Sequence, residues 1–172
     1  FQPDTNQVVC KLCPSGYFQL AENQKRCNAC PMGWKELGDL LNCSACGVKL
    51  FQDESGKNNC KHCPAGFVQN STTQTRCLAC EPGKHETSTF RLGCTACAIG
   101  TYQNVRNQLT CKTCQAGLYQ TEIGQHFCQS CGTGQYIDDT ATIATSHDEA
   151  TDCKTCTIGK YIDDVGGNHG MY

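Results

Sequence analysis

This sequence of 172 residues lacks the material of a conventional hydrophobic core. It has one tryptophan and two methionines, and its hydrophobic fraction of 38% already includes 18 cysteines. It also lacks any run of about 18 apolar residues, so no membrane-spanning helix is predicted. The net charge of −2 argues against a nucleic-acid partner and against contact with an anionic membrane. The chain therefore needs cross-links to offset the entropy lost on folding.

A catalytic or metal-binding pattern is also missing. A nucleophile needs a base in a pocket that excludes water, and the short units described below are too thin to build one. The histidines share no ligand spacing, and each is expected on the solvated surface: His62, His85, His126, His147 and His169. We therefore expect no enzyme activity, no catalytic residue, no bound metal and no cofactor.

What the sequence does have is cysteine, and every cysteine belongs to a C-x-x-C pair. The pairs begin at Cys10, Cys27, Cys43, Cys60, Cys77, Cys94, Cys111, Cys128 and Cys153. Successive pairs are 16 or 17 residues apart, except for a last step of 25. A repeat this short is typical of a linear array of small units, each in contact with its neighbours.

The pairs favour disulfides over zinc, although two C-x-x-C pairs can supply four thiolates to one zinc ion. Nine pairs cannot be grouped two by two, and a zinc array would alternate short and long spacers, whereas these are uniform. Asn70 (in N-S-T) and Asn42 (in N-C-S) are candidate N-glycosylation sites, and Asn70 is the better one because Asn42 adjoins Cys43. A zinc-binding array is the lesser alternative.

The unit between two pairs predicts which cysteines are bonded. After most pairs the chain reads C-x-x-G-x-aromatic-Gln, so a glycine with positive φ would open a hairpin: Gly16, Gly33, Gly66, Gly83, Gly100, Gly117, Gly134 and Gly159. The hairpin closes when the second cysteine of one pair bonds to the first of the next. The predicted bonds are Cys13–Cys27, Cys30–Cys43, Cys46–Cys60, Cys63–Cys77, Cys80–Cys94, Cys97–Cys111, Cys114–Cys128 and Cys131–Cys153. The alternative joins two successive pairs first to third and second to fourth.

Cys10 and Cys156 are left over by this scheme. The chain opens and stops within a unit, so their partners are expected outside it, in a longer repetitive protein. Lys49 replaces the expected glycine, which puts the turn at that position in doubt.

Each aromatic residue of the unit is expected to pack on its own disulfide as a minimal core: Phe18, Phe51, Tyr102, Tyr119, Tyr136 and Tyr161. Trp34 is also expected to be structural, with a partner anchor as the alternative. Five acidic residues cluster around an expanded loop, residues 132–152: Asp138, Asp139, Asp148, Glu149 and Asp152. A calcium-binding site is the alternative interpretation of this loop, because oxygen ligands are concentrated there. Since it lacks a calcium motif, we predict an exposed, threonine-rich loop open to O-glycosylation.

Grouping the units by three gives a longer repeat. Its first members begin CKLCPSG, CKHCPAG and CKTCQAG, which divides the chain into supermodules 1–59, 60–110 and 111–172. The motif C-x-x-C-P-x-G-x-[YF]-Q resembles the ephrin-receptor-like cysteine-rich repeat, and the single loop is similar to the smallest module of tumour-necrosis-factor-receptor cysteine-rich domains. The resemblance implies an elongated extracellular architecture of irregular β structure with disulfide rungs.

The predicted fold is a small disulfide-rich repeat array, an elongated rod of short irregular β-hairpin loops with little or no helix. The predicted function is structural: a segment of a long extracellular filament, appendage or cell-coat fibre. Its partners would be copies of itself or neighbouring repeats, with glycans attached. The alternative is a ligand-binding or spacer stalk in the ectodomain of a receptor or adhesin.

Overall fold

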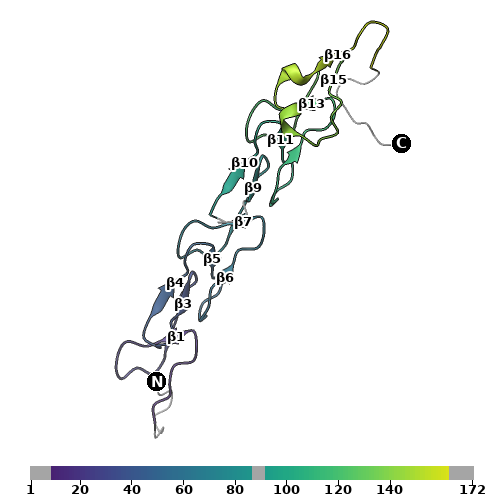
Figure 1. Ribbon diagram of the computed structural model, residues 1–172. Helices are drawn as coiled ribbons and strands as arrows, with labels where there is room; N and C mark the ends of the chain where they lie inside the picture. The colour runs from purple at the N-terminus through teal and green to yellow at the C-terminus, as the bar shows by residue number, and fades with distance from the viewer. Residues whose placement is uncertain (1–8, 87–91, 163–172) are drawn as a thin grey trace, which may run out of the picture. The chain divides into compact units, whose positions relative to one another are not determined.

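The computed structural model describes residues 9–86 and 92–162 (Figure 1). The described residues fall into two compact units. Residues up to Leu78, together with 92–93, make the first, and the other described residues make the second. The predicted division into three supermodules is a different grouping, by sequence, and stays a prediction.

Both units are built from short hairpins. Eight two-stranded sheets occur among the described residues, each formed by consecutive strands. The paired strands are β1 (Tyr17–Phe18) with β2 (Asn28–Ala29), β3 (Trp34–Glu36) with β4 (Cys43–Ala45), β5 (Leu50–Phe51) with β6 (Lys61–His62), β7 (Phe67–Val68) with β8 (Leu78–Ala79), β9 (Lys84–Glu86) with β10 (Cys94–Ala96), β11 (Thr101–Tyr102) with β12 (Lys112–Thr113), β13 (Leu118–Tyr119) with β14 (Gln129–Ser130), and β15 (Gln135–Tyr136) with β16 (Lys154–Thr155).

Helical structure in the described residues is limited to two 3-10 turns in the expanded loop, η1 (Ala144–Ser146) and η2 (Ala150–Asp152). In the described part of the chain no helix has the length and apolarity needed to cross a membrane. The prediction of a hairpin array with little or no helix is confirmed.

A turn precedes most of the hairpins, and it depends on a left-handed residue. All the glycines predicted to have positive φ do so, from +71° at Gly100 to +88° at Gly16. Lys49 keeps the same conformation, with φ of +67°, so the turn doubted at that position is present. Two or three residues per strand are too few for an isolated hairpin to be stable. Each hairpin therefore needs its covalent closure.

Eight disulfides supply that closure, and they join the same cysteines that the loop spacing predicts. The Cα–Cα distances lie between 5.5 and 5.9 Å, within the normal range for a disulfide. Because these sixteen sulfur atoms are bonded to one another, they are not thiolate ligands, and the zinc alternative does not fit. Cys10 and Cys156 are in no disulfide.

In the described residues the buried side chains are mainly disulfide cysteines and polar residues rather than those of an apolar core. The second cysteine of each pair from Cys30 to Cys131 is at most 2% exposed. Apart from cysteines, the buried apolar side chains in the described segments are Val68 and Ile137. The other buried side chains are polar: Glu36, Gln52, Gln69, Glu86, Gln103, Gln120 and His147.

Candidate functional site

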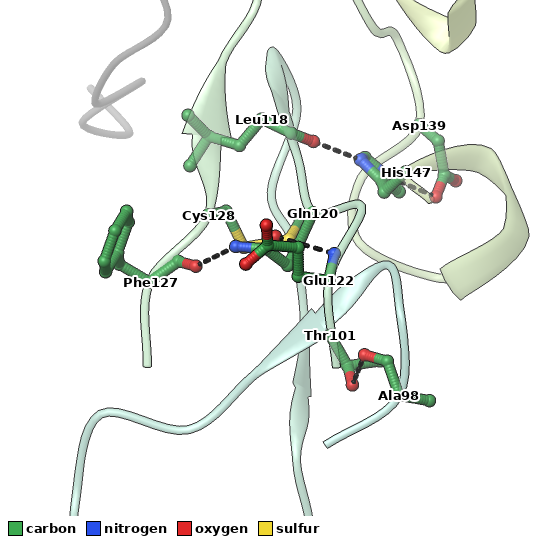
Figure 2. The surroundings of a disulfide bond; sticks show 10 residues. Ala98, Thr101, Leu118, Gln120, Glu122, Phe127, Cys128, Asp139 and His147 are labelled. Atoms are coloured by element: carbon green, nitrogen blue, oxygen red, sulfur yellow. Dashed lines mark hydrogen bonds and ion pairs between the residues drawn. A yellow bond between two sulfur atoms is a disulfide. The ribbon is translucent and has the colours of Figure 1, made fainter. Parts of the chain in front are cut away.

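A glutamine side chain braces each standard hairpin from within. In the hairpin closed by Cys114–Cys128, Nε2 of Gln120 donates to the carbonyl of Phe127 at 2.8 Å (Figure 2). Its Oε1 accepts the backbone N–H of Glu122 at 3.0 Å. The amide thus bridges the two sides of the hairpin, which a carboxylate, having no donor, cannot do. The same pair of bonds recurs at Gln19, Gln52, Gln69 and Gln103.

Two hairpins carry glutamate at this position, and their strands are longer. Glu36 accepts the backbone N–H groups of Gly38 and Leu40 through Oε1. Its backbone pairs with Cys43, which makes β3 and β4 three residues long. Glu86 is likewise opposite Cys94 in the three-residue pair β9 and β10. A third backbone pair therefore takes the place of the amide bridge.

Neighbouring hairpins are joined by backbone hydrogen bonds at three recurring positions. The backbone N–H of the turn glycine donates to the carbonyl of the residue that follows the first strand of the next hairpin, as Gly100 does to Gln120 at 2.7 Å. The bracing residue donates to the carbonyl of a residue near the next tip, as Gln103 does to Gln125 at 3.2 Å. The next tip donates back to a cysteine carbonyl, as Gly124 does to Cys97 at 2.7 Å.

This three-bond junction recurs in both units. The corresponding donor and acceptor pairs are Gly33 to Gln52, Glu36 to Lys57 and Gly56 to Cys30, then Lys49 to Gln69, Gln52 to Gln74 and Thr73 to Cys46, and, in the second unit, Gly83 to Gln103, Glu86 to Gln108 and Asn107 to Cys80. Every donor and acceptor is a backbone atom, so no side chain takes part in these bonds.

Contacts also reach the second neighbour, and they explain why the turn needs glycine. A Cβ built on Gly83 would lie 2.0 Å from the carbonyl oxygen of Gly124, two hairpins further along. At Gly100 the clash would be with the carbonyl of Ala144, at 2.1 Å. Glycine at these turns therefore provides both a positive φ and the space for a neighbouring backbone.

The expanded loop keeps two of the three junction bonds, from Gly117 to Ile137 and from Gln120 to His147. Ile137 stands where the bracing glutamine would be, and the buried His147 takes over (Figure 2). Nδ1 of His147 lies 2.7 Å from the carbonyl oxygen of Leu118, and Nε2 lies 3.0 Å from Oδ2 of Asp139. Both partners only accept, so both contacts are hydrogen bonds when the ring carries two N–H groups and is a cation. The backbone N–H of Gln120 donates to the carbonyl of His147 at 2.8 Å, and this bond replaces the one that a bracing residue makes to a residue near the next tip at the other junctions.

Asp139 organises the start of the same loop. It accepts the backbone N–H groups of Thr142 and Ile143, each at 3.1 Å, and the hydroxyl of Thr142. The pKa of the Asp139 carboxyl lies well below its ordinary value of 3.8 because hydrogen bonds stabilise the charged form. The hydroxyl of Thr142 makes the largest contribution, followed by the N–H of Ile143 and the ring of His147. The prediction that His147 lies on the solvated surface is wrong, because it forms the inner support of this loop.

His85 is the second histidine that departs from the prediction. It is half-buried, and its Nδ1 lies 3.2 Å from Sγ of Cys111. With Cys97 these donor atoms lie within 4.8 Å of one another, and they are the one possible group of metal ligands found in the described segments. The two sulfur atoms are bonded to each other, so they offer no thiolate to a metal.

Two side chains at the aromatic position contact the disulfide of the next hairpin. Tyr119 packs against Cys131, Ile137 and Cys153, the cluster of the following hairpin. His85 occupies the aromatic position and likewise contacts Cys111 of the following hairpin. The prediction that each aromatic packs on its own disulfide stays a prediction. At these two places the side chain also contributes to the junction between hairpins.

The other predicted residues are placed as follows. Asn42 and Asn70 are exposed, Trp34 is half-buried in β3, His62 and His126 are exposed, and His169 lies outside the described residues. The acidic side chains around the expanded loop do not converge on one point: Asp138 pairs with Lys154 at 2.9 Å, and Asp152 accepts the backbone N–H of Glu149. The calcium alternative thus has no cluster of oxygen ligands in the described residues.

One exposed charge cluster lies in the hairpin closed by Cys46–Cys60. Lys57, and then Lys61, lower the pKa of Glu54 to about 2, and Lys61 also pairs with Asp53 at 2.6 Å. These side chains are 40 to 51% exposed, so salt screens the pairs and they contribute little to stability.

Comparison with protein families gives one match. The family model described as "Tyrosine-protein kinase ephrin type A/B receptor-like" matches residues 1–36, 33–73 and 106–149, which together are more than half of the chain. A search of curated proteins finds no match.

Proposed function

This chain belongs to the ephrin-receptor-like family of cysteine-rich repeats, and on that basis we propose that it is a structural segment of a long extracellular fibre, appendage or cell coat. Repeats of this family are typical of extracellular cysteine-rich domains, and an oxidising compartment is where so many disulfides persist. The partners we propose are neighbouring repeats or further copies of the chain.

The observation that carries the proposal is the recurring junction between hairpins. The same three backbone bonds recur at four junctions, two in each unit. An array built this way can be lengthened without new recognition chemistry, because each added hairpin offers its neighbour the same donors and acceptors. That property suits a structural protein whose length matters more than any single surface.

Electron microscopy of the native material tests this proposal. Gold-labelled antibodies raised against the 172-residue chain should decorate fibres or a surface coat at repeated intervals. Label confined to single membrane-anchored particles, with no fibre or coat, would refute the structural role.

The second candidate is a spacer or ligand-binding stalk of a receptor or adhesin. It is favoured by the description of the matching family, which names a receptor. The full-length sequence separates the two candidates. A transmembrane helix followed by a cytoplasmic signalling domain would support the stalk, and further repeats leading to a polymerisation domain would support the fibre.

We also propose that the segment has no enzymatic role and binds neither nucleic acid nor membrane. The net charge of −2 supports the second statement. For the first, His147, the most buried histidine of the described residues, has both ring nitrogens occupied by Leu118 and Asp139, so it is not available as a general base. Asn70 is the proposed glycan attachment site, because it is exposed and lies in a sequon.

A further inference from the structure

The disulfides of this chain create a second covalent path that bypasses the first strand and the tip of each hairpin. Each one bonds the second cysteine of a pair to the first cysteine of the next pair. One can therefore pass from Cys13 to Cys27 through sulfur, along the backbone to Cys30, and through sulfur again to Cys43. Continued to Cys153, this path follows the second strand of seven hairpins, such as β2 and β12, but it never enters a first strand or a tip. We call it the disulfide spine.

The disulfide spine is much shorter than the polypeptide. It contains eight disulfide spans of 5.5 to 5.9 Å between Cα atoms and seven C-x-x-C segments. With each segment stretched to at most about 11 Å, its full length is about 120 Å. The backbone between the same two ends, Cys13 and Cys153, would reach about 490 Å if the disulfides were open. The bonds thus limit extension to roughly a quarter of what the chain length allows.

We propose that this segment is a tension-bearing tether, in which the disulfide spine carries the load and the first strand and tip of each hairpin stand outside the load path. This rests on the proposed structural function and specifies how it would work. A force applied at the ends passes through the sulfur bridges, because the shorter of two parallel covalent paths becomes taut first. The hairpin tips carry no covalent load, and they keep the shape given by the bracing glutamines, such as Gln103 and Gln120.

The junctions between hairpins give the tether a small reversible extension. Tension separates neighbouring hairpins, and the bonds that resist are backbone contacts such as Gly100 to Gln120 and Gly124 to Cys97. When they break, the chain lengthens only until the disulfide spine is taut. The hairpins remain closed by their own disulfides, so the same contacts re-form when the force is released.

Single-molecule pulling tests the proposal. The oxidised 172-residue chain is held by peptide tags at its two ends, stretched and relaxed repeatedly, and then stretched again in a dithiol reductant. In the oxidised chain we expect the segment between Cys13 and Cys153 to reach a maximum length of about 120 Å. Reduction of the disulfides should increase this length by about 370 Å. An oxidised chain that releases hundreds of ångströms would overturn the proposal.

Two double variants test whether the gain in maximum length follows the number of residues that each disulfide closes. Removing Cys97–Cys111 by C97S/C111S should add about 40 Å, and C131S/C153S should add about 70 Å, because their disulfides span 14 and 22 residues. These lengths depend on covalent connectivity, so they hold even if a variant hairpin unfolds. Equal gains in the two variants would overturn the disulfide spine. Absence of fibres in microscopy would refute the structural function while leaving these lengths unchanged.

Discussion

Replacing Gln103 by alanine should open its hairpin locally without releasing the disulfide. Gln103 is 1% exposed, its Nε2 donates to the carbonyl of Thr110 at 2.7 Å, and its Oε1 accepts the backbone N–H of Val105 at 3.1 Å. Each bond contributes about 1 kcal/mol net, and a buried group left without a partner costs about 1–3 kcal/mol. The variant should therefore lose about 2–3 kcal/mol of protection against local opening. Cys97–Cys111 still holds the ends together.

Hydrogen exchange of the oxidised chain, followed by NMR, measures this loss directly. Since about 1.4 kcal/mol corresponds to a factor of ten, the amide of Val105 should exchange roughly 30- to 140-fold faster in Q103A. Gln108 is the matched control, because its half-buried side chain donates a hydrogen bond only to the nearby carbonyl of Arg106, at 3.0 Å, and does not bridge the hairpin. Q108A should change the exchange of Val105 by less than about threefold.

A conservative variant separates the two halves of the amide. Gln103→Glu keeps an acceptor for the N–H of Val105 and removes the donor to Thr110, so the increase in exchange should be intermediate. If Q103A left the exchange of Val105 within threefold of the original, or if Q108A matched it, the brace would not be what holds the hairpin, and the reasoning would be wrong.

Three further predictions concern the turn, the expanded loop and the cross-links. Gly83→Ala should lower the unfolding temperature far more than Gly134→Ala. Both glycines have positive φ, so alanine costs about 1–2 kcal/mol in backbone strain at either position. A Cβ at Gly134 meets nothing within 4 Å, whereas a Cβ at Gly83 clashes with a backbone carbonyl. The lowered pKa of Asp139 means that its contribution is fully present above about pH 3.8 and is lost as the pH falls below that value, so exchange of the Ile143 amide should rise in acid, and Asp139→Asn should abolish this dependence. Intact mass should increase by about 2 Da per disulfide on reduction, and bound zinc with free thiols would contradict the structure.

The parts of this fold that follow from the sequence are those fixed by local chain geometry. A cysteine spacing of 13 or 14 residues and a glycine three residues after the pair are enough to place the bridge and the turn of a hairpin. The recurring Gln103 and Gln120 were visible as a motif, but their role depends on a carbonyl seven residues away that carries no sequence signal.

His147 and Tyr119 could not be placed in this way. The ring of His147 contacts Leu118, 29 residues earlier, and Tyr119 packs on the disulfide of the following hairpin. A signal for the first exists in retrospect, because Ile137 interrupts the glutamine series in the one loop that is expanded. A hairpin without its brace needs another internal support, and a polar side chain within the added residues was the candidate.

The backbone character of the inter-hairpin junction has an evolutionary consequence. A contact made by N–H and C=O groups is indifferent to substitution at most positions, so outward-facing side chains can change without altering how hairpins join. The expanded loop shows that even a length change is accommodated, since the carbonyl of His147 still accepts the N–H of Gln120 across added residues. Charge and loop length on the surface can then vary, while cysteine and glycine stay under constraint.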